Sequence, residues 1–255
     1  MSHKIYRVNT FVSKLCRGNP ACVIPLKQWL SDENLLQIAK ENGVPETAFF
    51  IDNGNDFHLR WFTPDLEIDL CGHATLATAH VLKSIFNHSS DTIEFKTFSG
   101  ELTVSYRNDF YYLNFPSRKA KPTTLPKEIE LALNMQPKRV FKARDYMLVY
   151  ENQKQIEELK INRDVFDTIN LGHGGVVVTA EGDLVDFVSR FFTPQATILE
   201  DPVTGSSHCT LIPFWSSRLL KKDLEALQLS ERGGYLICKD MSERVIIAGK
   251  ANTDL

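Results

Sequence analysis

The pattern of hydrophobic and polar residues predicts a chain that mixes strands and helices. Short runs rich in apolar, β-branched and aromatic residues, several of them alternating with polar ones, favour strands at residues 4–12, 21–25, 47–52, 57–62, 92–95, 101–106 and 110–115. Apolar residues at helical spacing follow Ser31, a good N-cap, and an apolar helix rich in alanine and leucine is expected over residues 74–85, just after Gly72. Similar segments continue to the end of the chain, so we predict an α+β fold.

An internal repeat divides the sequence into two related parts. Residues 56–64 read DFHLRWFTP and residues 186–194 read DFVSRFFTP, with six of nine positions identical. A glycine begins a predicted helix of small residues at Gly72 and again at Gly205, 133 positions later. We therefore predict two similar lobes, residues 1–116 and 117–255. Ligand pockets are common where such units meet, so we expect the active-site cleft between the lobes.

Composition excludes several classes of protein. The formal net charge is −3 and no basic run occurs, which argues against a nucleic-acid partner. No apolar run approaches the roughly 20 residues that span a bilayer, and the first ten residues have no apolar signal segment. The five cysteines are odd in number and show no metal-binding spacing. We therefore predict a cytoplasmic protein with reduced cysteines, no membrane contact and no metal.

Two glycine-containing loops are the candidate binding elements. One loop reads DLCGHAT at residues 69–75, and the other reads EDPVTGSSH at residues 200–208. Each delivers a glycine to the expected start of a helix, where free backbone N–H groups and a positive partial charge favour anions. Thr75 and Ser206 add hydroxyl donors. Two such loops that face each other would hold a small carboxylate-bearing molecule.

Four ordered segments resemble those of a known family. The segments are GNPA at residues 18–21, PETAF at 45–49, DLCGHAT at 69–75 and DPVTGS at 201–206. In order and spacing they are similar to the signature segments of the phenazine-biosynthesis PhzF-like isomerases. The resemblance implies the diaminopimelate epimerase-like fold, in which a mixed sheet wraps around a central helix in each of two lobes. It also implies a homodimer.

The resemblance further implies proton transfer without a cofactor. A glutamate at the position of Glu46 shuttles a proton within trans-2,3-dihydro-3-hydroxyanthranilate in the characterised family member. His73 would position Glu46 or contact the substrate, and Asp201 would bind an amino or hydroxyl group or orient His73. Glu46 begins an apolar run, where desolvation would raise the pKa of its carboxyl toward the range useful for acid–base chemistry. The predicted substrate contacts are Asn19, Gly72, Thr75, Thr204, Gly205 and Ser206.

Two other functions remain open at this level. Epimerases of the same broad fold use one cysteine in each loop, and Cys71 stands directly before Gly72. Thr204 stands before Gly205, and its hydroxyl is too weak an acid to replace a thiol. At the 130-residue offset Glu46 corresponds to Val176, so a single carboxylate base is expected. The alternatives are an amino-acid racemase or epimerase that depends on Cys71, and a binding protein without catalysis.

Overall fold

Strands make up most of the fold, and those predicted in the first half of the chain are confirmed with ends shifted by at most two residues. The computed structural model describes residues 3–253. The first half forms β1 (Tyr6–Val12), β2 (Asn19–Leu26), α1 (Asp32–Asn42), β3 (Glu46–Asp52), β4 (Phe57–Phe62), β5 (Glu67–Ile68), α2 (Gly72–Ser84), β6 (Thr92–Thr97), β7 (Gly100–Arg107) and β8 (Phe110–Pro116).

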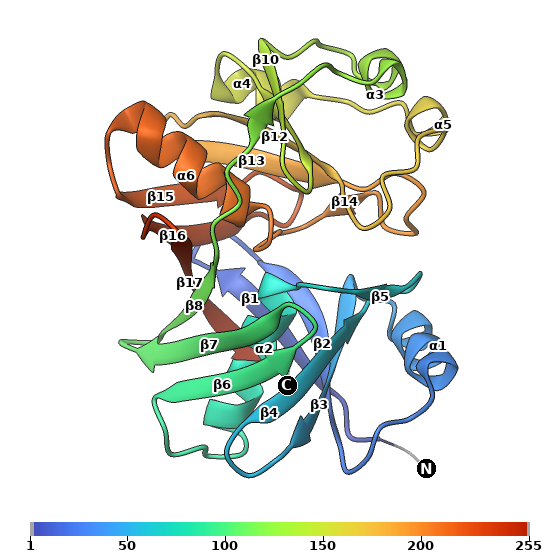
Figure 1. The fold of residues 1–255 in the computed structure, drawn as a ribbon, viewed down its shortest axis with the longest axis vertical. Coiled ribbons are helices and arrows are strands. Elements are labelled where there is room, and N and C mark those ends of the chain that lie inside the picture. Colours follow the sequence, from blue (N-terminus) through green and yellow to red (C-terminus); the bar gives the residue numbers. More distant parts are fainter. Residues whose placement is uncertain (1–2, 254–255) are drawn as a thin grey trace.

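The second half adds further strands around a second long helix. Its elements are β9 (Lys121–Pro122), α3 (Lys127–Ala132), β10 (Arg139–Lys142), β11 (Tyr146–Val149), α4 (Gln153–Glu158), α5 (Arg163–Phe166), β12 (Val176–Glu181), β13 (Phe187–Phe192), β14 (Glu200–Asp201), α6 (His208–Leu219), β15 (Asp223–Gln228), β16 (Gly234–Asp240) and β17 (Arg244–Thr253). Figure 1 shows the second-half elements up to β16 in the upper part of the molecule and the first-half elements below, and β17 runs from the upper part into the lower one beside β8. None of the described helices has the length and apolar character needed to cross a membrane.

Eight strands close a ring around α2. Strands β1, β2, β3, β4, β6, β7, β8 and β17 pair in that order, and β17 pairs with β1 to complete the ring. Every α2 residue from Gly72 to Ala79 is buried. A helix that is buried on all sides carries mostly small or apolar residues, which explains its alanine-rich sequence. The ring fixes where α2 begins, and therefore where His73 lies.

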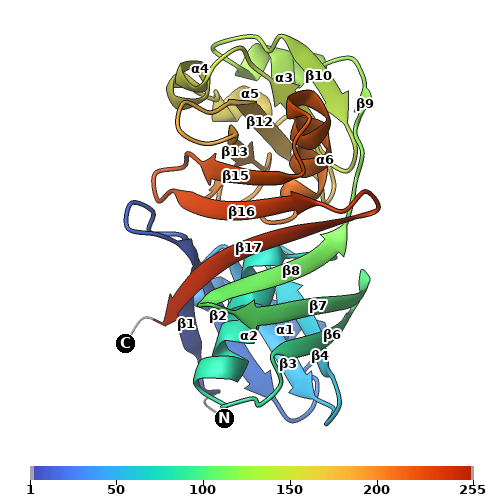
Figure 2. The same cartoon turned by 90° about the vertical axis from the view of Figure 1, so that its left-hand side faces the viewer.

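Helices cover both faces of the part of the sheet that contains β11, β12 and β13. Alternate residues of β11, β12 and β13 pack either toward α6, as Met147, Val177 and Phe187 do, or toward α3, α4 and α5, as Leu148 and Val178 do. Burial on both faces explains why these strands read as nearly continuous apolar runs. The strands carry the sheet to β17, which pairs with β16 and β8 through its first part and with β1 through residues 250–253. The last strand thus crosses between the two parts of the molecule (Figure 2).

The pairing pattern of the two halves is the same. In the first, β3, β4 and β5 are antiparallel neighbours, β4 pairs parallel with β6, and β6, β7 and β8 follow as antiparallel neighbours. In the second, β12 to β17 repeat each of these relations in the same order. The repeated nine-residue segments contain β4 and β13.

The second helix begins later than the sequence indicated. We expected it to start at Gly205, but α6 starts at His208. Residues 205–207 instead form a tight turn, in which the N–H of His208 donates to the carbonyl of Gly205 and the N–H of Cys209 donates to that of Ser206. The first helix does begin at Gly72.

Candidate active site

A cavity of about 400 Å³ lies where the two glycine loops meet. Thr63 and Pro64 from the first repeat segment line it, and so do Thr193 and Pro194 from the second. At its rim, the carboxylate of Asp65 accepts hydrogen bonds from the backbone N–H and the hydroxyl of Thr197, at 2.8 and 2.7 Å. Both repeat segments therefore contribute to the lining of one site.

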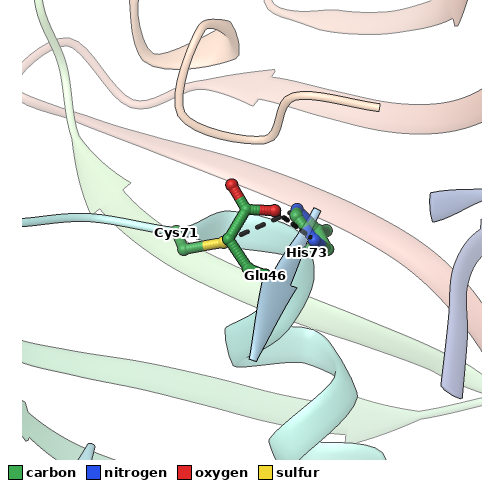
Figure 3. Close-up of side chains that lie close together, drawn as sticks. All are labelled: Glu46, Cys71 and His73. Carbon is green, nitrogen blue, oxygen red and sulfur yellow. Dashed lines mark hydrogen bonds and ion pairs between the residues drawn. The ribbon is translucent and has the colours of Figure 1, made fainter. Parts of the chain in front are cut away.

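Three chemically active side chains meet on the floor of this cavity. Glu46 is the first residue of β3, while Cys71 and His73 flank the first residue of α2 (Figure 3). His73 Nε2 lies 2.9 Å from Glu46 Oε2, and its Nδ1 lies 3.5 Å from Cys71 Sγ. The contact between Glu46 and His73 is an ion pair by distance, but the two atoms lack the alignment of a hydrogen bond. The Glu46 oxygen is thus buried without an aligned donor.

Burial and neighbouring charge set the protonation of this cluster. Burial disfavours the imidazolium, but Cys71 and the Glu46 carboxylate beside the ring outweigh it and raise the pKa of His73 well above its usual value. Burial also raises the pKa of the Cys71 thiol to about 11. The neighbours of His73 therefore favour its protonated ring, and burial favours a neutral Cys71 thiol.

Asp201 approaches the cluster from the second half and is held by several donors. The Nδ2 group of Asn19 donates to its Oδ1 at 2.6 Å, and the Thr204 hydroxyl donates to its Oδ2. Burial and the charge of Glu46 raise the pKa of Asp201 to about 6. Its carboxyl can therefore change protonation state close to neutral pH.

The backbones of the two loops touch at their glycines. A Cβ atom on Gly72 would lie 2.8 Å from Cα of Gly205, and one on Gly205 would lie 2.9 Å from Cα of Gly72. No real side chain tolerates such distances, so this approach requires glycine on both sides. Close contact brings the start of α2 and the turn before α6 to a single point on the cavity wall.

Most of the predicted site residues line the cavity, and two do not. Those in the lining are Glu46, Gly72, His73, Asp201, Thr204, Gly205 and Ser206. Asn19 lies behind Asp201, where its Nδ2 also donates to the carbonyl of Val203. Thr75 is buried within α2 and its hydroxyl donates to the carbonyl of Cys71. The contacts of these two residues therefore support the loops, and the direct substrate contact predicted for Thr75 is not available in this structure.

Sequence reasoning missed Arg144, whose side chain also lines the cavity. It lies in the connection between β10 and β11, and its guanidinium donates to the Ser206 hydroxyl at 3.1 Å. No local pattern distinguishes this arginine, because the turn around it carries several other charged residues. Only the folded chain brings it to Ser206, 62 positions away.

Strand register corrects the predicted counterpart of Glu46. Thr47 lies opposite Phe62 in the first half, and Val176 lies opposite Phe192 in the second. Since Phe62 and Phe192 are equivalent in the repeat, Glu46 corresponds to Gly175 and not to Val176. A Cβ atom on Gly175 would lie 2.4 Å from the Phe191 ring. The second half therefore has no room for a side chain where the first half carries its carboxylate.

The same floor also contains the side chains that could bind a metal. Ligand atoms of Glu46, Cys71 and His73 all lie within 4.8 Å of one another. The observed contacts already join these three groups to one another. A divalent ion would have to displace the protons of the thiol and the imidazolium. Nothing in this arrangement calls for a metal, and its absence stays a prediction.

Comparison with known proteins shows which family this chain belongs to. The family model described as phenazine biosynthesis-like protein matches residues 8–254. An uncharacterized isomerase of Pseudomonas aeruginosa is 44% identical over 251 residues, which cover 98% of this chain and 96% of that protein. The crystal structure of a phenazine biosynthesis protein of the PhzF family from Enterococcus faecalis superimposes with a TM-score of 0.91 at 42% identity, covering 100% of this chain and 98% of that one.

The chain therefore belongs to the phenazine biosynthesis-like PhzF family of isomerases. Its fold extends to more distant proteins. A hydroxyproline epimerase from Agrobacterium vitis aligns with a TM-score of 0.62 at 11% identity, over 99% of this chain and 91% of that one. At that identity the likeness concerns the fold alone.

Proposed function

We propose that the protein is a cofactor-independent isomerase that moves a proton within a small carboxylic acid bearing an amino or hydroxyl group. The observation that carries this proposal is the single carboxylate of Glu46, held against His73 on the cavity floor, with Gly175 at the equivalent position of the other half. One base on one face of the substrate suits removal and return of a proton on the same face. Racemisation requires acid–base groups on opposite faces.

The proposed reaction begins with the substrate carboxylate bound at the loop glycines. The N–H of Gly72 at the start of α2 and the hydroxyl of Ser206 are the donors. Glu46 removes a proton from a carbon next to an unsaturated or carbonyl-conjugated centre, and the electron pair of that C–H bond delocalises into the conjugated system. Glu46 then returns the proton to another carbon. The imidazolium of His73 balances the charge of Glu46, and Asp201 holds the amino or hydroxyl group.

The remaining predictions concern organisation. We propose that residues 1–116 and 117–255 are duplicated lobes, each with a central helix, which the repeated strand pairing supports.

We also propose a cytoplasmic homodimer. Light scattering of the purified protein tests the dimer, since one chain has a mass of 29.0 kDa. A single-chain mass at micromolar concentration would refute it.

Deuterium wash-in tests the proposed reaction directly. The protein is incubated in heavy water with a panel of cyclic and acyclic amino and hydroxy acids that includes trans-2,3-dihydro-3-hydroxyanthranilate, and exchange at carbon is followed by proton NMR. We expect exchange or isomerisation of at least one acid, and a loss of about 10²- to 10⁴-fold in Glu46→Gln. Cys71→Ser, at the other end of the cluster, is the matched control and should keep most of the activity.

Two outcomes would overturn the assignment. Exchange that survives in Glu46→Gln but disappears in Cys71→Ser would indicate the thiol-dependent racemase or epimerase. Tight binding of acids without any exchange across the panel would indicate a binding protein. The neutral state of the Cys71 thiol and the presence of Thr204, and not a second cysteine, before Gly205 argue against the thiol mechanism.

A further inference from the structure

Arg144 lines the cavity and contacts both glycine loops. Its Nη2 donates to Ser206 Oγ at 3.1 Å, its Nη1 donates to Asp69 Oδ1 at 3.3 Å, and its Nε donates to Asp145 Oδ1 at 3.2 Å. Asp69 precedes Gly72 in the first loop, whereas Ser206 follows Gly205 in the second. A single guanidinium therefore contacts both loops that form the proposed carboxylate site.

The contact with Arg144 determines how Ser206 can act. A guanidinium is always protonated and has donors only, so the Ser206 oxygen must be the acceptor in this pair. The hydroxyl hydrogen of Ser206 then points away from Arg144. Because Ser206 is buried and lines the cavity, that hydrogen is available to a ligand there. Arg144 thus holds Ser206 as a donor, which is the orientation that a carboxylate requires.

Neighbouring carboxylates hold the guanidinium in place. Asp145 is only 1% exposed and its Oδ1 also accepts the N–H of Gly175, so it forms a fixed anchor. Three of the five guanidinium N–H groups are used by the three observed contacts, which leaves two for other partners. The cavity also contains Glu46 and Asp201, which repel an incoming carboxylate. The positive charge of Arg144 on the cavity wall opposes that repulsion.

We propose that Arg144 is the positioning residue of the carboxylate subsite: it holds Ser206 as a hydrogen-bond donor and supplies the positive charge that favours an acidic ligand over its neutral isostere. The proposal rests on the proposed function for the identity of the bound group. Arg144 contacts Ser206, Asp69 and Asp145, and none of these is the proposed base. Its loss should therefore weaken binding and raise KM, while kcat changes little.

A binding experiment without turnover tests this subsite. The probes are 2-aminobenzoate and its neutral isostere 2-aminobenzamide, and titration calorimetry gives a Kd for each. We expect the wild-type protein to prefer the acid by at least about 10-fold. Arg144→Met should weaken binding of the acid about 10- to 100-fold, the range for a charge-assisted hydrogen bond, and weaken binding of the amide much less, because the amide carries no charge. Arg144→Lys keeps the charge without the planar fork and should recover part of the preference.

Arg118→Met is the matched control. The Arg118 side chain is 21% exposed against 20% for Arg144, and it approaches the same Asp69 at 3.8 Å, but it does not line the cavity. We expect its preference for the acid to equal that of the wild type. Ser206→Ala tests the route of action. If Arg144 acts through Ser206, the two losses of affinity are not additive. The Arg144→Met/Ser206→Ala double variant then has the same Kd for the acid as whichever single variant binds the acid less tightly.

Specific outcomes would overturn the inference. A wild-type protein that binds acid and amide equally has no carboxylate subsite here, and an unchanged preference in Arg144→Met removes the role of Arg144. Additive losses in the double variant contradict action through Ser206. Failure of the proposed function gives a different result from failure of this inference. In that case the wild-type protein shows no exchange at carbon with any acid, but it still binds the acid more tightly than the amide. With an active substrate, a fall in kcat at constant KM in Arg144→Met would also contradict the proposal.

Discussion

The loops before α2 and before α6 rest on the same supporting contacts. In the first half, Arg60 Nε donates to Glu67 at 2.7 Å across the pair β4 and β5, and in the second half Arg190 Nε donates to Glu200 at 2.7 Å across β13 and β14. Each guanidinium also stacks on a phenylalanine two residues further along its strand. Even the carbonyls before the glycines are satisfied alike: Thr75 donates to that of Cys71, and the ring of His208 donates to that of Thr204.

The side chains that line the site differ at equivalent positions of the two halves. The first half places Glu46, Cys71 and His73 where the second places Gly175, Thr204 and Ser206. The second half also carries a carboxyl group that the first half lacks. Asp201 lies opposite Phe191, and the equivalent residue of the first half is Ile68, which lies opposite Trp61. One half therefore carries the proposed base and its counter-ion, and the other carries hydroxyl donors and the carboxyl whose pKa is raised to about 6. The lesson is that two halves with the same strand pairing can build an asymmetric site when the side chains at equivalent positions differ.

The largest expected effect concerns the two supporting ion pairs. Arg190→Met should lower the free energy of unfolding by about 3–5 kcal/mol, because it leaves Glu200 partly buried without its partner. It also frees the carbonyls of Ile156 and Leu159, which Arg190 Nη1 binds at 3.1 and 2.9 Å. Arg60→Met is the matched variant, and its extra contact is the exposed Asp32. The loss in the free energy of unfolding for Arg60→Met should be about 1–3 kcal/mol smaller than for Arg190→Met. Urea unfolding measures both, and equal losses would contradict this difference.

The pH dependence of stability sharpens the comparison at Asp201. Its pKa rises from 3.8 in a free side chain to about 6 in the folded protein. The folded state thus binds the proton of Asp201 more tightly, so the contribution of this group to the free energy of unfolding is greatest below about pH 4 and falls by about 3 kcal/mol as pH rises through 6. Asp201→Asn should remove that slope in urea unfolding between pH 4 and 7. Asp223→Asn, at an aspartate whose side chain is 73% exposed, should keep it. Parallel profiles for wild type and Asp201→Asn would refute the shift.

A methyl group at Gly175 tests why the second half lacks a side chain there. Gly175→Ala places Cβ at 2.4 Å from the Phe191 ring and 2.7 Å from the Phe192 carbonyl, so the strand or the ring must shift. We expect a loss of about 1–3 kcal/mol in the free energy of unfolding. Gly175→Ala/Phe191→Leu should recover part of it by relieving the ring contact. A single variant as stable as the wild type would mean that packing does not impose the asymmetry.

The smallest expected effect is at the rim of the cavity. Asp65→Ala removes both hydrogen bonds to Thr197 and so releases one wall from the other. The thermal midpoint should fall by no more than about 3 °C, because both residues are exposed. Alkylation of Cys71 on the cavity floor by iodoacetamide, followed by peptide mass spectrometry, should become several-fold faster. Asp56→Ala, in the distant β3–β4 hairpin, is the control. An unchanged rate in Asp65→Ala would show that these bonds do not limit access.

Local patterns were enough to predict much of the framework. The alternation of residues 57–62, the N-cap Ser31 and the apolar run after Gly72 are properties of neighbouring residues, and the corresponding elements form as expected. The ordered segments around Glu46, Gly72 and Gly205 also predicted that the proposed base and the glycine loops belong to one site. They meet in one cavity because pairing of β3 with β2 and β4 brings Glu46 beside the start of α2.

The sequence by itself determined seven strands of the first half, the helix that begins at Gly72, the repeat and the residues proposed to carry the proton transfer. Only the tertiary structure decided the strand register that makes Gly175 the equivalent of Glu46, and the hydrogen bond from Thr75 to the Cys71 carbonyl. It also decided that α6 begins at His208 and that Arg144 contacts Ser206. The physical reason is that hydrophobic periodicity and capping act over a few residues. Strand register, steric exclusion and charge pairing depend on groups that are distant along the chain and meet only after folding.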